Sequence, residues 1–196
     1  MNTLINTTLC YIQKDDCYLM IHRVKKVNDY NKDKWIGIGG KFENGESPFD
    51  CVRREVLEET GLILNEEKLE YRGIVTFVCK NSDAPDGLFT EFMHLFWCDD
   101  FDGTLIDSDD CNEGVLEWVP KSAMNDLPHW KGDEIFLDLI EKNDYINGSW
   151  VNKIVDGKPI HEDYNDPFYS FGWENDDIKT VITHEQMEQM AYKVGD

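Results

Sequence analysis

Residues 39–62 read GGKFENGESPFDCVRREVLEETGL, and the local structure that this stretch predicts carries the candidate functional residues. Ser47-Pro48 predicts the start of a helix, because serine caps helix N-termini and proline is tolerated in the first turn. Gly61 predicts its end, since glycine readily adopts the left-handed conformation that follows many helices. The glycines of residues 37–40 indicate a close approach of the backbone to another group. The stretch therefore predicts a loop, a helix and a second loop.

The expected helix carries acids beside its apolar side. Glu55, Glu58 and Glu59 share an arc of about 100° when residues are spaced as in an α-helix. The side expected to face the core is formed by three apolar residues: Val52, Val56 and Leu57. Carboxylates three and four positions apart repel, so the cluster is either a solvated helix face, protonated, or a site for a divalent cation. The glycine loop and Arg54 among the acids favour a site for Mg²⁺ or Mn²⁺.

Outside this stretch the pattern is that of an α+β chain. Strands are expected over residues 3–13, 17–23, 69–80, 88–98 and 115–119, a helix over 132–142, and a hairpin of 150–155 and 160–164 around Asp156-Gly157. This order predicts a mixed sheet with a few helices packed on it.

The last thirty residues are expected to form an extension, residues 167–196, to a domain of residues 1–166. Thr183 and Gln186 match a capping box, which predicts a short helix. Its apolar face would be formed by Met187, Met190, Ala191 and Val194. Such a helix either docks on its own domain or contacts a second copy, so the chain is expected to be a monomer or a homodimer.

Charge limits the partners of this 196-residue chain. Its net charge is −21, but residues 1–60 carry nine basic and ten acidic side chains, so most of the excess lies further on. The overall charge opposes binding to nucleic acid polymers and to anionic membranes, whereas a small metal-bound anion stays possible in the first third. The sequence shows no membrane-length apolar run and no signal-peptide pattern, so a cytoplasmic location is expected.

Cysteine usage supports the same location. The six cysteines form no CxxC pair and have no zinc-type spacing with the five histidines. We expect reduced thiols, several of them buried, rather than a disulfide framework.

The run that begins at Gly40 and ends at Leu62 resembles the Nudix box, the signature of hydrolases that act on a nucleoside diphosphate linked to another group. Every defined position is met without a gap: Gly40, Glu46, Arg54, Glu55, Val56, Glu58, Glu59, Gly61 and Leu62. The resemblance implies a Nudix-type α/β/α sandwich on a mixed sheet, with a loop–helix–loop that holds Mg²⁺.

Roles for individual residues follow from the same resemblance. The expected metal ligands are the Gly39 carbonyl and the side chains of Glu55, Glu58 and Glu59. One of these glutamates, or an acid outside the box, would orient or deprotonate the attacking water. Glu46 and Arg54 would pair to hold the box in shape. The implied reaction is water attack on a phosphorus of a polyphosphate, with metal charge stabilising the transition state.

Over roughly residues 3–165 the chain is also similar to the MutT-type branch, which hydrolyses oxidised purine nucleoside triphosphates. The resemblance makes Glu113 the acid outside the box, with a solvated loop glutamate as the alternative. Trp130 would stack on the purine and Asp133 would hydrogen-bond its edge; the alternative is a core tryptophan and an acid at a helix start. Arg23 and Lys41 would lie near the phosphates, unless they are simply solvated.

Two positions depart from human-type members of that branch. Ile36 stands where those members carry asparagine, and Gly132 stands where they carry aspartate. Both positions resemble a bacterial, streptococcal-type subgroup instead. The complete box and the Trp130–Asp133 segment lead us to expect cleavage of a nucleoside triphosphate, favourably 8-oxo-dGTP, to the monophosphate and pyrophosphate. The alternatives are hydrolysis of ADP-ribose or a dinucleoside polyphosphate, and a nucleotide-binding module without catalysis.

Overall fold

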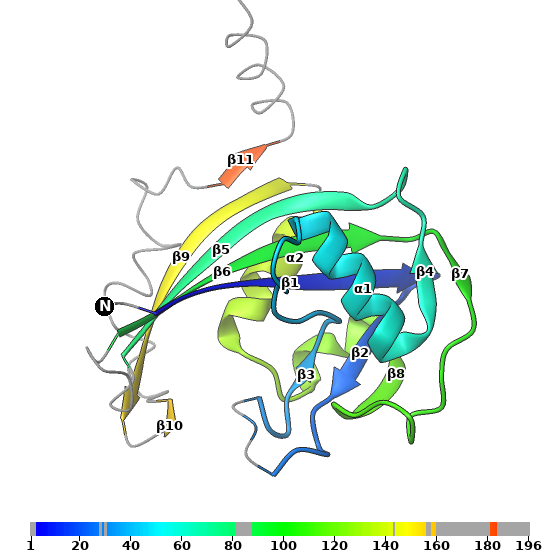
Figure 1. Ribbon diagram of the computed structural model, residues 1–196, viewed down its shortest axis with the longest axis horizontal. Helices are drawn as coiled ribbons and strands as arrows, with labels where there is room; N and C mark the ends of the chain where they lie inside the picture. The colour runs from blue at the N-terminus through cyan, green and yellow to red at the C-terminus, as the bar shows by residue number, and fades with distance from the viewer. Residues whose placement is uncertain are drawn as a thin grey trace, which may run out of the picture. The chain divides into compact units, whose positions relative to one another are not determined.

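The computed structural model describes residues 3–27, 29, 31–80, 88–142, 144–155, 158–159 and 181–183 (Figure 1). The chain divides into two compact units. One unit contains Thr7–Tyr71 and His94–Ile135, and the other contains Met1–Asn6, Arg72–Met93 and Phe136–Asp196. We call them the box unit and the second unit, because the first contains the stretch with which the sequence analysis began.

The box unit is built on antiparallel strands. Its elements are β1 (Thr3–Lys14), β2 (Cys17–His22), β3 (Trp35–Ile36), α1 (Pro48–Thr60), β4 (Leu62–Leu64), β7 (Phe101–Gly103), β8 (Val115–Pro120) and the 3-10 helix η1 (Lys121–Asp126). Strand β2 pairs with β1, β3 and β8. Strands β4 and β7 form a separate two-stranded sheet. Four elements, β1, β5, β6 and α2, have residues in both units.

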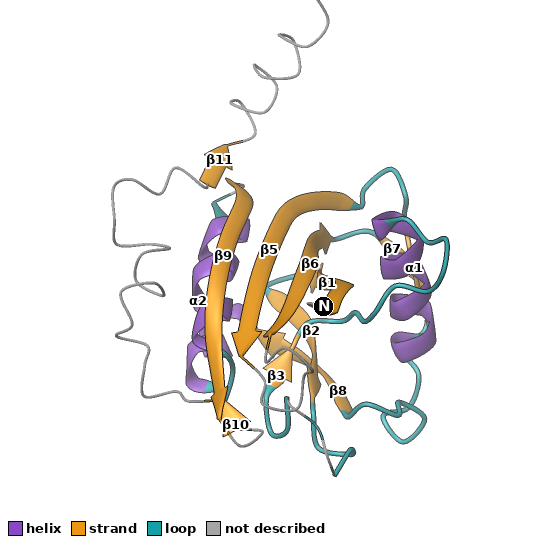
Figure 2. Ribbon diagram, turned by 60° about the vertical axis from the view of Figure 1, so that its left-hand side comes forward, coloured by secondary structure: helices purple, strands orange, loops and turns teal. Residues whose placement is uncertain are grey.

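The second unit contains a parallel strand pair. Its elements are β5 (Glu70–Lys80), β6 (Leu88–Cys98), α2 (Lys131–Glu141), β9 (Asp144–Val155), β10 (Lys158–Pro159) and β11 (Val181–Thr183). Strand β9 runs parallel to β5 and antiparallel to β10 and β11, so the sheet is mixed. Figure 2 shows that strands predominate and that helices are few. No helix in the described ranges is long and apolar enough to cross a membrane.

The expected α+β fold with a mixed sheet is confirmed. The sequence analysis missed the short elements β3, β4, β7, η1 and β11, and it misplaced the ends of others. The first strand of the expected hairpin begins at Asp144 rather than at residue 150. Its partner is the short pair Lys158–Pro159, while residues 160–164 lie outside the described residues. The expected terminal helix also lies outside them, apart from Thr183, which ends β11.

The core of the box unit holds α1 against the strands. Its buried side chains come from β1, β2, α1, β4, β6, β8 and the connecting loops: Cys10, Ile12, Leu19, Ile21, Ile38, Val52, Val56, Leu62, Leu64, Leu69, Phe96, Cys98, Cys111 and Leu116. Burial of this apolar surface fixes the helix and the loop before it in one arrangement. Everything that α1 presents at its edge is therefore held in place by the core.

The expected core side of α1 is wrong at one position. Leu57 is 50% exposed, whereas the buried residues of the helix are Cys51, Val52, Val56 and Thr60. Thr60 enters this set because its hydroxyl donates to the Val56 carbonyl, at 2.6 Å, and so is satisfied inside the core. The buried arc is thus turned toward the glutamates and away from Leu57. Glu55 and Glu59 fall within that arc rather than beside it.

Candidate active site

Local capping sets both ends of α1. The Ser47 hydroxyl accepts from the Asp50 N–H (3.2 Å), and the Asp50 carboxylate accepts from the Ser47 N–H (3.1 Å), which is a complete capping box. Pro48 occupies the first turn. At the other end Gly61 has a φ of 74° and donates to the Leu57 carbonyl (2.9 Å). The helix therefore has the limits that the sequence predicted.

The loop before α1 passes between β1 and the helix with no space for side chains. The Gly40 carbonyl accepts from Thr8 (2.8 Å), which holds the loop on β1. A Cβ atom on Gly39 would lie 2.2 Å from the Thr8 carbonyl oxygen. A Cβ atom on Gly40 would lie 2.5 Å from the carboxyl group of Glu55. Both positions therefore need glycine, because a side chain at Gly39 would overlap the β1 backbone and one at Gly40 would overlap the predicted site residue Glu55.

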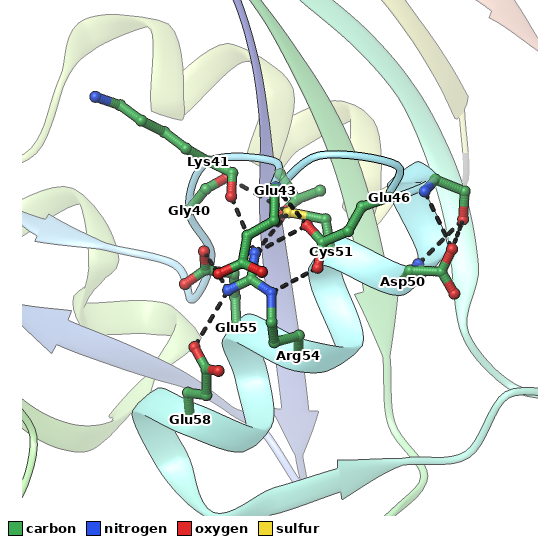
Figure 3. A network of polar contacts seen from close by, with 11 residues as sticks. Gly40, Lys41, Glu43, Glu46, Asp50, Cys51, Arg54, Glu55 and Glu58 are labelled. Carbon is green, nitrogen blue, oxygen red and sulfur yellow. Dashed lines mark hydrogen bonds and ion pairs between the residues drawn. The ribbon is translucent and has the colours of Figure 1, made fainter.

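Arg54 lies at the centre of the polar network in Figure 3. Its Nε and Nη2 donate to the two oxygens of Glu46 at 2.6 and 2.9 Å, and Nη2 also donates to the Lys41 carbonyl at 3.0 Å. Its Nη1 reaches Glu55 at 2.9 Å and Glu58 at 3.2 Å. Hydrogen bonding to Arg54 lowers the pKa of Glu46 to about 2. The arginine therefore ties the loop to the acidic edge of the helix.

The three glutamates of the helix have different surroundings. Glu59 accepts from the Gly39 N–H at 3.3 Å, and burial, followed by repulsion from Glu55 and Glu113, raises its pKa to about 8. Burial also raises the pKa of Glu55, although Arg54 opposes the change. The Glu58 side chain is 59% exposed and contacts Arg54. Two of the acids are therefore destabilised as anions by the fold itself.

The donor set suits a hard divalent cation. Within the described residues, no three side chains of His, Cys, Asp or Glu are placed together as a ready metal group. Two of the expected ligands, Glu55 and Glu58, hydrogen-bond Arg54 instead. Carboxylate oxygens are nevertheless the ligands that Mg²⁺ prefers, and Glu59 lies close enough to Glu55 and Glu113 for their negative charges to raise its pKa, a repulsion that a bound cation would relieve. The residues present fit such an ion.

Glu113 lies near Glu59 and is bound by two cations. Arg23 Nη1 contacts its Oε2 at 2.5 Å, and the Lys26 ammonium contacts Oε1. Arg23 also donates to Asp29 at 2.7 Å. The charge of Glu113 contributes to the raised pKa of Glu59. The structure therefore brings Glu113, the expected acid outside the box, and Arg23, the residue directly after β2, to the same site.

Trp130 and Asp133 lie at the start of α2. Asp133 is 8% exposed, accepts from the Trp130 N–H at 3.1 Å, and has its pKa raised to about 7 by burial. The Trp130 indole N–H donates to Asn31 at 2.8 Å, and the Lys34 ammonium lies 4.9 Å from the centre of an indole ring. Sequence reasoning missed Asn31 and Lys34, because each is about 100 positions from Trp130 and no local pattern marks them.

The remaining predicted residues are placed differently. Lys41 is exposed, and Figure 3 shows its side chain directed away from the Arg54 cluster; only its carbonyl joins the network. Ile36 lies opposite Ile21 in the β2–β3 pair. Next to it, the Trp35 ring stacks on His22, with ring centres 4.6 Å apart. The backbone N–H of Trp35 donates to the Pro128 carbonyl at 2.8 Å. The segment before the box is thereby joined to the segment before α2.

Comparison with known proteins agrees with this geometry. The family model described as the NUDIX domain matches residues 4–140. An uncharacterised Nudix hydrolase of Bacillus subtilis, YvcI, is 32% identical over 143 residues, which cover 72% of this chain and 82% of the relative. The oxidised purine nucleoside triphosphate hydrolase of Danio rerio is 29% identical over 119 residues, covering 59% and 67%. The crystal structure of a MutT protein from Bacillus halodurans has a TM-score of 0.64 at 24% identity, covering 80% and 94%.

The chain belongs to the Nudix family, and it is a hydrolase of phosphorus-containing acid anhydrides. Its mixed α+β fold is the Nudix fold. Nudix hydrolases generally use divalent metal ions such as Mg²⁺, and their substrates are small nucleotides. The family expected from the box is thereby confirmed, whereas the choice of substrate stays a proposal.

Proposed function

We propose that this chain is a Mg²⁺-dependent pyrophosphohydrolase that cleaves purine nucleoside triphosphates, with 8-oxo-dGTP as the favoured substrate, to the monophosphate and pyrophosphate. The observation that carries the proposal is the pairing of two groups in one unit. The glycine loop and α1 supply the acids, and the start of α2 supplies an aromatic ring beside a buried carboxyl. The named activity of the Danio rerio relative supports the same substrate class.

The metal would be held by the Gly39 carbonyl, Glu55, Glu58 and Glu59, with Mn²⁺ as a substitute for Mg²⁺. When bound, the ion supplies positive charge to the phosphate oxygens and to the leaving group. Two hydrogen bonds join Arg54 to Glu46, so the position of Arg54 does not depend on its contacts with Glu55 and Glu58. Those two carboxylates can therefore exchange partners while the loop stays tied.

A glutamate would orient or deprotonate the attacking water, which forms the new P–O bond as the bridging P–O bond between the nucleoside monophosphate and the pyrophosphate breaks. The candidates are Glu55, Glu58, Glu59 and Glu113. Glu59 and Glu113 are near each other, as the effect of Glu113 on the Glu59 pKa indicates. Arg23 and Lys26 beside Glu113 supply positive charge that suits the substrate phosphates. The exposed side chain of Lys41 points away from the acidic cluster (Figure 3), so it would contact only those substrate phosphates that extend into solvent beyond the loop.

The base would be bound at the start of α2. Stacking of a purine on Trp130 stabilises binding by about 1–3 kcal/mol. Because burial raises the pKa of Asp133 to about 7, its carboxyl group can accept or donate a hydrogen bond at the purine edge near neutral pH. Ile36 and Gly132 remove two polar groups that human-type relatives use, so this edge contact carries more of the base selection here.

A substrate panel tests the proposal. Hydrolysis products are separated by ion-exchange chromatography and quantified, with Mg²⁺, for 8-oxo-dGTP, dGTP, dATP, ADP-ribose and a dinucleoside polyphosphate, since only the triphosphates can release pyrophosphate. We expect 8-oxo-dGTP to give the highest kcat/KM, and Glu58→Gln and Glu59→Gln to lose at least about 100-fold in kcat. Glu67→Gln, an exposed glutamate outside the site, is the matched control. A preference for ADP-ribose would move the substrate to the diphosphate derivatives, and nucleotide binding without hydrolysis would indicate a binding module.

Domain limits and location belong to the same proposal. We place the catalytic domain in residues 1–166, with 167–196 as an extension of a monomer or homodimer, and the family match over residues 4–140 supports the first limit. Five cysteines of the described part are free thiols, namely Cys10, Cys17, Cys51, Cys98 and Cys111. Free thiols suit a reducing compartment, which supports a cytoplasmic location.

A further inference from the structure

Lys25 lies against a turn that presents three backbone carbonyls to one point. Its ammonium donates to the carbonyl oxygens of Ser108, Asp109 and Cys111 at 2.5, 3.2 and 2.8 Å. The turn itself is closed by the Cys111 N–H, which donates to the Ser108 carbonyl at 3.2 Å. We call this group of three carbonyls the carbonyl cradle. It lies wholly within the box unit.

The cradle has the chemistry of a cation site. Backbone carbonyl oxygens that converge on one point replace the hydration shell of a potassium ion or an ammonium group. The residues of the turn add negative charge, since Asp107, Asp109 and Asp110 are all acidic. In this chain, the cation is supplied by the lysine side chain. Charge-assisted hydrogen bonds of this kind are stronger than those between neutral groups.

The carbonyl cradle lies close to Glu113 along the chain. The Cys111 carbonyl belongs to a residue that is 1% exposed and lies two positions before Glu113. On the lysine side, Arg23 lies two positions before Lys25 and contacts the Glu113 carboxylate. One short segment after β2 therefore holds the 107–113 segment in two ways. Lys25 binds its carbonyls, and Arg23 and Lys26 bind the Glu113 carboxylate.

The neighbouring backbones are close enough for this restraint to act. Strand β2 pairs with β8 so that His22 lies opposite Val115, and both segments leave the sheet at that point. A Cβ atom on Gly114 would lie 2.0 Å from the His22 carbonyl oxygen. A shift of the turn at Ser108 to Cys111 is therefore carried to Glu113 and is not absorbed by slack in the chain.

We propose that Lys25 is a positioning residue whose ammonium fills a cation cradle of the Ser108, Asp109 and Cys111 carbonyls, and so fixes Glu113 for the hydrolysis. The inference rests on the proposed function, because it gives Glu113 a part in the reaction. A monovalent cation of similar size, such as K⁺ or NH₄⁺, takes the same place when the side chain is cut back to alanine.

The test is chemical rescue of Lys25→Ala at constant ionic strength. In choline chloride, we expect kcat to fall about tenfold with little change in KM, because misplacement of a catalytic group reduces the rate more than the binding. Exchange of choline for K⁺ or NH₄⁺ restores most of kcat. The wild type and Lys32→Ala, an exposed lysine on the same loop, change by less than about twofold in the same series of salts. The proposal is overturned if Lys25→Ala keeps the wild-type kcat in choline chloride, or if its kcat falls and neither K⁺ nor NH₄⁺ restores it.

A second measurement separates the cradle from the catalysis. Amide hydrogen exchange of residues 107–113 is followed without nucleotide, in choline and in potassium chloride. Lys25→Ala is expected to exchange faster than the wild type in choline and to slow again in potassium. Equal exchange in the two salts overturns the cradle. Absence of hydrolysis by the wild-type chain would overturn the proposed function, and the exchange rates would still decide whether Lys25 fills a cation site.

Discussion

The carboxylate of Glu59 accepts a hydrogen bond from the backbone N–H of Gly39, at 3.3 Å, across twenty positions of sequence. This contact joins the last turn of α1 to the loop that precedes the helix. The Arg54–Glu46 ion pair makes a second connection nearer the start of the helix. Loop and helix are therefore held together at both ends of the acidic edge, and five predictions depend on this arrangement and on its surroundings.

Gly40→Ala is expected to remove activity by displacing Glu55. The added Cβ atom would lie 2.5 Å from the Glu55 carboxyl group, so one of the two must move. Misplacement of a catalytic carboxylate by about 1 Å can cost about 100-fold in kcat. Steady-state kinetics with Mg²⁺ measure the loss. Gly45→Ala is the control, because a Cβ atom there meets nothing within 4 Å, although its φ of 89° still strains the backbone. Gly40 itself has no positive φ, so a loss in Gly40→Ala reports the contact with Glu55, and full kcat in this variant would contradict the prediction.

Arg54→Lys is expected to behave as a severe substitution. Lysine keeps the charge but cannot donate to both oxygens of Glu46 and also reach Lys41 and Glu55. We expect kcat to fall at least about tenfold. The matched control is Arg53→Lys. Arg53 lies on the same helix, and the substitution alters only its exposed pair with Glu66 after β4, so kcat is expected to stay near the wild-type value. Retention of full kcat by Arg54→Lys would remove the proposed tie between loop and helix.

Asp133→Asn is expected to stabilise the chain above neutral pH. The folded pKa of Asp133, about 7, lies above the ordinary value near 3.8. The folded state therefore keeps a proton that the unfolded state loses between about pH 4 and 7, and stability falls as the pH rises through that window. The variant lacks this loss, so its free energy of unfolding at pH 8 should exceed that of the wild type by up to about 4 kcal/mol, about three pKa units at about 1.4 kcal/mol each. Urea unfolding at pH 4 and pH 8 measures the difference, which should be small at the lower pH. A constant difference at both pH values would contradict the buried, protonated carboxyl.

Binding of Mg²⁺ is expected to release protons near neutral pH. In the ion-free chain, burial and repulsion raise the pKa of Glu59 to about 8, so this carboxyl group is largely protonated at pH 7. A metal ligand must be deprotonated, and the affinity for Mg²⁺ should therefore rise with pH up to about 8. Titration calorimetry in buffers of different ionisation enthalpy counts the protons. Glu59→Gln should bind more weakly and lose the proton release. Proton release that persists in Glu59→Gln would assign it to another group.

Trp130→Ala is expected to raise KM for purine nucleotides about 5- to 100-fold, the equivalent of a stacking interaction of about 1–3 kcal/mol. Trp130→Phe keeps an aromatic face and should recover part of the affinity, although it loses the hydrogen bond to Asn31. Inorganic tripolyphosphate, which has no base, should be hydrolysed equally by all three proteins. An equal loss with tripolyphosphate would show that Trp130 supports the fold and does not bind the base.

The limits of α1 were predictable because caps are local. Ser47, Pro48, Asp50 and Gly61 lie within one turn of the ends that they set, and each acts through its own backbone or the adjacent turn. The acidic cluster was predictable for the same reason, since spacing along a helix fixes which side chains are neighbours.

Features that depend on distant partners were not predictable. Leu57 is apolar yet exposed, because packing against the strands and not apolarity decides which arc of a helix is buried. Strand β9 begins six residues earlier than expected because its first residues pair with β11, a short strand near the end of the chain. The cation bound to the carbonyl cradle comes from Lys25, more than eighty positions away, and no local signal marks such a contact.

The inward turn of α1 has a consequence for how this sequence can evolve. Glu55 and Glu59 lie within the buried arc, where their negative charge is unfavourable unless a cation is present. Neutral side chains of the same shape would make the metal-free chain more stable at the expense of catalysis. Selection for thermal tolerance alone would therefore replace these two residues early. Their retention in related sequences would therefore be expected only where the proposed turnover is under selection.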